Sequence, residues 1–283
     1  MLVRVFRLLS HLPLRMLHLL GAALGWLVWL VSPTHRRRLV ENLTRAGYAA
    51  RRNAAISQSG KSILELAFVW CAAPKRVLAT ARVEHWDIAQ QALDAGGGVI
   101  FLTPHLGCFE IIAQYIASRE PLTVLYRPPR KAALKPLMEG ARRRPNLALA
   151  PANLSGVRML LKALKGGGAI GLLPDQVPQN GEGVWADFYG TPAYTMTLPA
   201  KLAQMTGAPI ILAYAERLPG GAGFIIRFVP GPVLSAGSPQ QQAQQLNGAM
   251  QDLIARCPDQ YFWSYNRYKR PAGIVPPSEA VAA

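Results

Sequence analysis

The stretch Gly98-Val-Ile-Phe-Leu-Thr-Pro-His105-Leu-Gly107-Cys108-Phe-Glu110 carries the strongest structural signal in the chain. An apolar run of strand length ends at a proline, and a histidine, a glycine and a glutamate follow it closely. A short apolar run bounded by turn residues is typical of a strand that is buried on both faces. We therefore expect a buried strand that brings His105 to its carboxyl end.

A second stretch repeats this pattern. In Gly166-Gly-Gly-Ala-Ile-Gly-Leu-Leu-Pro174-Asp175, as in residues 96–105, glycines precede an apolar run that ends in a proline and an ionisable residue. If the two strands are parallel members of one sheet, His105 and Asp175 emerge at the same edge, where open α/β sheets bind ligands. Glycine-rich turns also precede many buried strands that carry no site, so the repeat alone does not establish a function.

The spacing of His105 and Glu110 limits how the two side chains can meet. Five residues apart, they point in different directions on a regular helix and lie on opposite faces of a strand. Pro104 and Gly107 permit an irregular turn, with Glu110 in the first turn of the helix that follows. The carboxylate could then hold one ring nitrogen while the other accepts a proton. The simpler reading is a polar histidine at a strand end and a glutamate favoured by the helix dipole.

The composition favours one large domain. A chain of 283 residues that is 51% hydrophobic can bury a single α/β core, and no proline- or serine-rich linker divides it. Cys71, Cys108 and Cys257 are too far apart to form a disulfide framework or a paired metal-ligand motif, so we expect no metal. The predicted fold is α/β, a single domain with a mostly parallel mixed sheet flanked by helices, preceded by an N-terminal hydrophobic membrane-anchoring helix.

Local patterns place the other elements and the domain limits. Further strands are expected at residues 82–84, 122–126, 147–150, 209–216 and 223–230, the last two forming a hairpin. Helices are expected at residues 33–45, 53–70, 86–93, 131–144, 153–165, 195–206 and 240–256, and one is expected to end near residue 118. The predicted division is an anchor at residues 1–31, a catalytic domain at 32–271 and a flexible tail at 272–283.

The N-terminal segment has the character of a membrane anchor. Residues 16–31 contain no charged side chain, although sixteen residues fall short of the roughly 20 that span a bilayer. Trp26 and Trp29 suit the membrane interface, and the arginines at 36–38 suit lipid headgroups. The segment is expected either to cross the bilayer at a tilt or to lie in its cytoplasmic face. A buried amphipathic core helix is the alternative. No small-x-small cleavage site follows, which disfavours a signal peptide.

The net charge of +16 favours a polyanionic partner. Residues 1–52 hold nine arginines and one acidic residue, Glu41, and therefore half of that charge. Basic charge beside an apolar helix indicates a membrane surface rather than DNA. Residues 261–270 interleave aromatic and basic side chains, which could stack on single-stranded nucleic acid but fit lipid headgroups as well. Nucleic acid, anionic lipid or an acidic carrier protein would each suit the net charge, but its distribution favours membrane lipid, and we expect no nucleic acid partner.

Taken together, the motifs resemble those of the bacterial lipid A biosynthesis (late, secondary) acyltransferases, within the glycerolipid and lysophospholipid acyltransferase superfamily. The resemblance covers nearly the whole chain. The residues that carry it are His105-x4-Glu110, the Tyr126-Arg127-Pro128 strand end, the Arg142 region, Pro174-Asp175-Gln176, Phe188-Tyr-Gly190-Thr-Pro-Ala193 and Tyr261-Phe-Trp-Ser-Tyr-Asn-Arg-Tyr-Lys.

This resemblance implies an O-acyltransferase of lipopolysaccharide biosynthesis. His105 matches the catalytic histidine and Glu110 its orienting acid, while substrate-binding roles fall to Arg127, Arg142, Asp175 and Gln176. The donor would be a fatty acyl thioester of acyl carrier protein, or of coenzyme A, and the acceptor a hydroxyl of a lipid A precursor. No cofactor or metal is implied. The enzyme would act at the bacterial inner membrane, with its catalytic domain on the cytoplasmic side.

The expected mechanism is direct transfer. His105 would remove the acceptor proton, Glu110 would stabilise the imidazolium, and backbone amides near Gly107 or Arg142 would stabilise the oxyanion. No Gly-x-Ser-x-Gly elbow is present, which leaves Cys108 as the rival nucleophile near His105. Two alternatives remain at this point: an acyltransferase with another lipid acceptor (a lysophospholipid, mannolipid or aminolipid), or a non-enzymatic module that binds membranes or nucleic acid.

Overall fold

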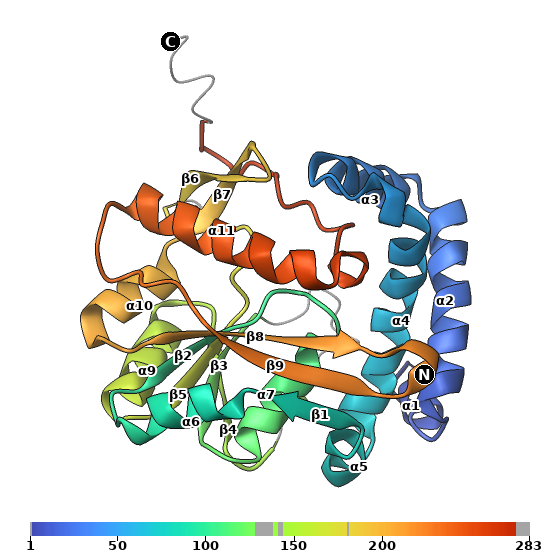
Figure 1. Ribbon diagram of the computed structural model, residues 1–283, viewed down its shortest axis with the longest axis horizontal. Helices are drawn as coiled ribbons and strands as arrows, with labels where there is room; N and C mark the ends of the chain where they lie inside the picture. The colour runs from blue at the N-terminus through green and yellow to red at the C-terminus, as the bar shows by residue number, and fades with distance from the viewer. Residues whose placement is uncertain (1, 128–137, 141–143, 180, 276–283) are drawn as a thin grey trace.

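The fold is built on one mixed sheet. The computed structural model describes residues 2–127, 138–140, 144–179 and 181–275 (Figure 1). Seven strands lie in the order β1-β9-β8-β2-β5-β3-β4, and a separate antiparallel pair is formed by β6 and β7. The strands are β1 (Ala81–Glu84), β2 (Val99–Leu102), β3 (Leu122–Tyr126), β4 (Leu147–Pro151), β5 (Ala169–Leu172), β6 (Gly183–Phe188), β7 (Thr191–Met196), β8 (Ile210–Arg217) and β9 (Phe224–Pro230).

Helices cover both faces of the sheet (Figure 1). In β2, Val99 and Phe101 pack into one core, while Ile100 and Leu102 pack into the other. All four side chains are buried, which explains the continuous apolar run of this strand. The helices are α1 (Leu2–Leu9), α2 (Leu14–Val31), α3 (Pro33–Arg45), α4 (Arg52–Cys71), α5 (Pro74–Leu78), α6 (Trp86–Asp94), α7 (Phe109–Ala117), α9 (Leu154–Lys165), α10 (Leu198–Thr206) and α11 (Pro239–Arg256).

The pairing of β2 with β5 confirms the central prediction about the sheet. The two strands are parallel neighbours, with Val99 opposite Ala169 and Leu102 opposite Leu172. Strand β8 flanks β2 on its other side and runs parallel to it, whereas β8 and β9 form the expected antiparallel hairpin. The sheet is therefore mixed but mostly parallel, and the two proline-ended runs finish at the same edge.

Most predicted boundaries lie within a few residues of those observed. One difference is at residues 195–197, where a helix was expected. Strand β7 continues to Met196 because Thr195 and Met196 pair with Val184 and Gly183 of β6, and α10 begins only at Leu198. Of the expected basic helix at 131–144, residues 131–137 and 141–143 lie outside the described residues. Residues 276–283 of the expected tail also lie outside them.

The N-terminal helix α2 packs directly against α4 (Figure 1). It is long and apolar enough to cross a membrane, judged by length and composition alone. Its contact with α4 requires glycines, because a Cβ atom on Gly60 would lie 2.0 Å from the Gly21 carbonyl oxygen. The boundary expected at residue 31 between anchor and domain stays a prediction.

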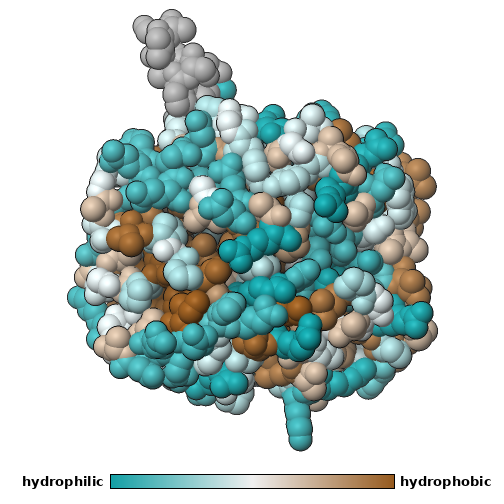
Figure 2. All heavy atoms as spheres, viewed as in Figure 1, coloured by the Kyte–Doolittle hydropathy of each residue, from teal (hydrophilic) through white to brown (hydrophobic). Residues whose placement is uncertain are grey.

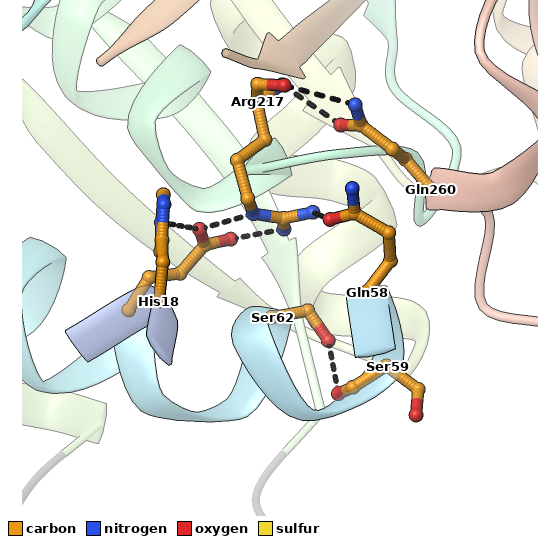
Figure 3. A network of polar contacts seen from close by, with 7 residues as sticks. His18, Gln58, Ser59, Ser62, Arg217 and Gln260 are labelled. Atoms are coloured by element: carbon orange, nitrogen blue, oxygen red, sulfur yellow. Dashed lines mark hydrogen bonds and ion pairs between the residues drawn. The ribbon is translucent and has the colours of Figure 1, made fainter. Parts of the chain in front are cut away.

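A buried ionic network joins α2, α4 and β8 (Figure 3). The Arg217 guanidinium donates to both carboxylate oxygens of Glu65, with Nε 2.6 Å from Oε2, and to the Gln58 amide oxygen at 2.7 Å. His18 Nε2 lies 3.2 Å from the same Glu65 oxygen. Burial alone would raise the pKa of Glu65, but Arg217 and the hydrogen bonds lower it from 4.5 to about 2.

We expect Glu65→Ala to destabilise the full chain by about 3–5 kcal/mol at pH 7, because Arg217 would keep a buried charge without its partner. A pKa below the unfolded value adds stability that is present above that value and lost as the pH falls toward the folded value. The difference between wild type and variant should therefore shrink as the pH falls from 4.5 toward 2.

Urea unfolding in mild detergent measures this difference, and Glu41→Ala is the matched control. Glu41 forms an exposed i,i+4 pair with Arg37, so its removal should cost about 0.5 kcal/mol or less. Equal losses for the two variants, or a Glu65→Ala effect that persists unchanged near pH 2, would contradict the buried-pair account.

Candidate active site

The turn after β2 requires a glycine at position 107. Gly107 has φ +61°, and a Cβ atom there would lie 1.9 Å from the Ala215 carbonyl oxygen of β8. Isolated bridges join Leu106 to Tyr261 and Gly107 to Ala215, and the amide of Phe262 donates to the His105 carbonyl oxygen at 3.1 Å. The turn is thereby fixed between β8 and the C-terminal segment, which holds the His105 backbone in place.

Asp175 reaches His105 across the edge of the sheet. One carboxylate oxygen accepts a hydrogen bond from the His105 backbone amide at 2.9 Å, and the other lies 2.8 Å from the ring nitrogen Nδ1. Asp175 is only 2% exposed. Burial would raise the pKa of this carboxyl group, but the His105 imidazole and the hydrogen bonds from His105 lower it below its usual range.

The second ring nitrogen faces an amide. Gln176 Nε2 lies 3.3 Å from His105 Nε2. An ionised carboxylate can only accept a hydrogen bond, and an amide nitrogen can only donate one, so the two contacts favour the same tautomer. Nδ1 carries the proton and Nε2 accepts. A histidine held in this tautomer has the arrangement required of a general base.

Glu110 lies on the helix that was expected to carry it, but another carboxylate is at His105 Nδ1. It lies in the first turn of α7, as predicted, and its Oε2 accepts a hydrogen bond from the Trp70 indole nitrogen at 3.1 Å. The carboxylate at His105 Nδ1 belongs to Asp175 instead. The strand register therefore brings a second carboxylate, Asp175, to His105, and the role of Glu110 as the orienting acid stays a prediction.

His105 and Glu110 line one cavity of about 520 Å³. Arg127 and Gln176, both expected to bind substrate, line it as well. Arg142 lies outside the described residues. A narrower apolar cavity of about 70 Å³ shares part of this wall and extends between α7 and the sheet. Its walls include Phe101, Ile112, Ile116, Val124, Gly171 and Leu172.

Sequence reasoning missed several residues around His105. The Phe109 ring lies 4.6 Å from the imidazole and the Phe262 ring 6.2 Å from it, measured between centroids. Trp70 and Lys201 also line the larger cavity. No local spacing links these residues to His105. The only sequence feature that pointed to any of them was the aromatic character of residues 261–265, which include Phe262.

The C-terminal motif is largely structural. Trp263 is buried, whereas Phe262 is 39% exposed and its ring centroid lies 6.2 Å from that of His105. Arg267 is buried and donates to the Tyr194 carbonyl oxygen at 2.8 Å and to the Thr195 hydroxyl at 2.7 Å. Trp263 and Arg267 thus dock this segment onto the core.

Cys108 is poorly placed to act as a nucleophile. Its thiol is buried, and Glu65 lies close by. Desolvation, and then the charge of Glu65, raise the pKa of the Cys108 thiol well above its ordinary value. It is absent from the described walls of the larger cavity.

The backbone amides of Gly107 and Cys108 already donate hydrogen bonds within the fold. Gly107 donates to the Gln260 carbonyl oxygen at 3.1 Å, and Cys108 to the Ala215 carbonyl oxygen at 2.8 Å. The expectation that amides near Gly107 stabilise an oxyanion is therefore wrong for these two groups. Across the part of the chain that the structure describes, no three His, Cys, Asp or Glu side chains gather as metal ligands would.

Comparison with known proteins agrees with this geometry. The family described as bacterial lipid A biosynthesis acyltransferase matches residues 1–270. The chain is 25% identical over 216 residues to the lipid A biosynthesis palmitoleoyltransferase of Escherichia coli (strain K12), covering 76% of this chain and 70% of that protein. It is 23% identical over 284 residues to the lipid A biosynthesis lauroyltransferase of the same organism, covering 96% and 92% of the two chains. The match of the family over nearly the full length shows that this chain belongs to the bacterial lipid A biosynthesis acyltransferases.

Proposed function

We propose that the protein transfers a fatty acyl group from the thioester of acyl carrier protein, or of coenzyme A, to a hydroxyl of a lipid A precursor. The observation that carries the proposal is the His105–Asp175 pair, with His105 on the wall of a cavity that adjoins a smaller apolar one, in a member of this family. The reaction would take place at the cytoplasmic face of the bacterial inner membrane, where precursor and carrier meet.

In the proposed mechanism, Nε2 of His105 removes the proton of the acceptor hydroxyl as its oxygen attacks the thioester carbonyl. The carbon–sulfur bond breaks and the carrier leaves as a thiol that takes up the proton. Asp175 keeps the proton on Nδ1 and stabilises the imidazolium that develops. Glu110, held by Trp70 on the cavity wall, positions the acceptor. No covalent acyl-enzyme is required.

Cationic side chains on the cavity wall suit the substrates. Arg127 at the end of β3 and Lys201 on α10 both line the larger cavity and are exposed. Either can contact a phosphate of the acceptor or of the carrier's prosthetic arm. The smaller apolar cavity, which shares part of this wall, supports a binding site for part of the acyl chain there.

We expect His105→Ala to abolish acyl transfer, whereas Cys108→Ala should retain most of it, because the thiol is buried away from the cavity. The assay incubates the detergent-solubilised full chain with an acyl-carrier thioester and an underacylated lipid A precursor, and detects acylated product by mass spectrometry. Parallel reactions with acyl-coenzyme A identify the donor. A well-folded Cys108→Ala variant without activity would overturn direct transfer, and no product from wild type would favour the binding-module alternative.

Asp175→Asn is expected to lower kcat by about 10²–10⁴-fold with little change in KM, because an amide no longer enforces the Nδ1–H tautomer. Asp187→Asn, an exposed aspartate on β6, serves as the control and should leave both constants unchanged. If Asp175→Asn raised only KM, Asp175 would contact substrate rather than orient His105.

Gly171→Ala should shift the enzyme toward shorter acyl donors. A Cβ atom at Gly171 would lie 3.0 Å from Val124 Cγ1, and both residues line the smaller apolar cavity. A methyl group added to an apolar pocket typically changes kcat/KM by about 10–200-fold between homologous substrates. Competition between donors of different chain length measures the ratio, with Gly97→Ala as the control because nothing lies within 4 Å of a Cβ atom there. An unchanged ratio would place the acyl chain elsewhere.

A further inference from the structure

Helix α2 has two apolar faces with different surroundings. Leu14, Leu17, His18, Gly21 and Gly25 are buried against the domain. On the opposite face, apolar residues recur at helical i, i+3, i+4 spacing, and each of them is 39–68% exposed. We call it the apolar face of α2, and it consists of Met16, Leu19, Leu20, Trp26, Leu27, Leu30 and Val31.

Exposed hydrophobic side chains concentrate at this end of the molecule. Ten of the seventeen large exposed hydrophobic residues that the structure describes lie in α1 or α2. Figure 2 shows hydrophobic atoms along the edge where Figure 1 places α2. A contiguous exposed apolar surface of this kind indicates a binding site for a protein or a membrane that covers it.

The buried face fixes α2 to the domain along much of its length. His18 contacts Glu65 at 3.2 Å near one end of the contact. Near the other end Trp26, the least exposed member of the apolar face, lies at its border and donates its indole N–H to the Ser57 hydroxyl at 3.2 Å. Between them, a Cβ atom on Gly25 would lie 2.1 Å from the Ile56 carbonyl oxygen. Such close backbone packing leaves no room for lipid between α2 and α4.

This attachment limits how α2 can enter a bilayer. Its neighbour α4 carries exposed Arg52 and Asn53 at one end, and its Glu65 is tied to Arg217 of the sheet. If α2 crossed the membrane, α4 and the edge of the domain would have to enter the hydrocarbon with it. Charged groups are strongly disfavoured there. Only the apolar face of α2 can be immersed without that cost.

The charge around the helix selects the partner. Arg4 and Arg7 in α1 and Arg15 at the start of α2 are exposed, as are Arg36 and Arg37 beyond its end. Apolar side chains bordered by arginine are the pattern of helices that lie in the plane of an anionic interface.

We propose that the apolar face of α2, together with α1, lies in one leaflet of an anionic phospholipid bilayer, and that the protein is monotopic, with no membrane crossing by α2. The catalytic cavity then lies beside this leaflet. Phe6 of α1 stacks on Trp70 at 6.2 Å between ring centroids, and Trp70 lines the cavity and bonds to Glu110. The inference concerns the membrane surface alone and holds whichever acyl acceptor the enzyme uses.

Cysteine labelling tests the topology. His11 precedes α2 and Thr34 follows it, and both are exposed. His11→Cys and Thr34→Cys are made separately in the full chain, and inner-membrane vesicles of one orientation are treated with an impermeant maleimide before and after detergent. The unsubstituted chain supplies the background from its own cysteines. Both positions should react from the same side as the catalytic domain. Labelling of one position with protection of the other until detergent is added would overturn the proposal.

Vesicle flotation tests the surface. The triple variant Leu19→Glu/Leu27→Glu/Leu30→Glu should bind phosphatidylglycerol-containing vesicles at least about 10-fold more weakly than wild type. Val233→Glu, at an apolar site that is even more exposed and far from α2 in sequence, is the control and should bind normally. Wild type should also bind neutral phosphatidylcholine vesicles more weakly than anionic ones.

Two outcomes would contradict the surface assignment. One is normal binding by the triple variant with unchanged thermal unfolding. The other is a wild-type dimer in sedimentation that the triple variant abolishes without any effect on vesicle binding, because the apolar face would then be covered by a second copy of the chain.

Discussion

The parallel register of β2 with β5 is the constraint on which the site depends. Leu102 lies opposite Leu172, so the prolines that end the two runs and the ionisable residues after them leave the sheet at the same level. Asp175 can then accept both the backbone amide and the ring of His105 at 2.8–2.9 Å. A shift of either strand by one residue would turn its apolar side chains to the opposite core and would separate the imidazole from its carboxylate.

The same sheet also fixes the side of the protein that carries α2. Arg217 at the end of β8 holds Glu65 of α4, and Glu65 in turn contacts His18 of α2. Helix α4 therefore has two roles: one of its surfaces receives the glycine-rich face of α2, and Leu66 and Trp70 form part of the cavity wall. The helix that carries the apolar surface is thus rigidly connected to the helix that borders the cavity.

Features of the fold and site that adjacent residues encode could be predicted from the sequence, whereas contacts between distant residues could not. The two strand ends were predictable because an apolar run, a proline and an ionisable residue are adjacent in sequence. The partner of Nδ1 was not, because spacing presented Glu110 as the nearest carboxylate, whereas Asp175 arrives from 70 residues away through the strand register. The Arg217–Glu65 pair spans 152 residues and has no local pattern at all. Nor can aromatic residues in a row show that Trp263 is buried while Phe262 is 39% exposed.

The tautomer of His105 tests the central claim most directly. Nitrogen-15 NMR of the histidine-labelled full chain, with the His105 signals assigned by their loss in His105→Asn, shows which ring nitrogen carries the proton when the ring is neutral. The account predicts a proton on Nδ1, hydrogen-bonded to Asp175, and an unprotonated Nε2. A proton on Nε2, or an Nδ1 signal that Asp175→Asn leaves unchanged, would contradict it.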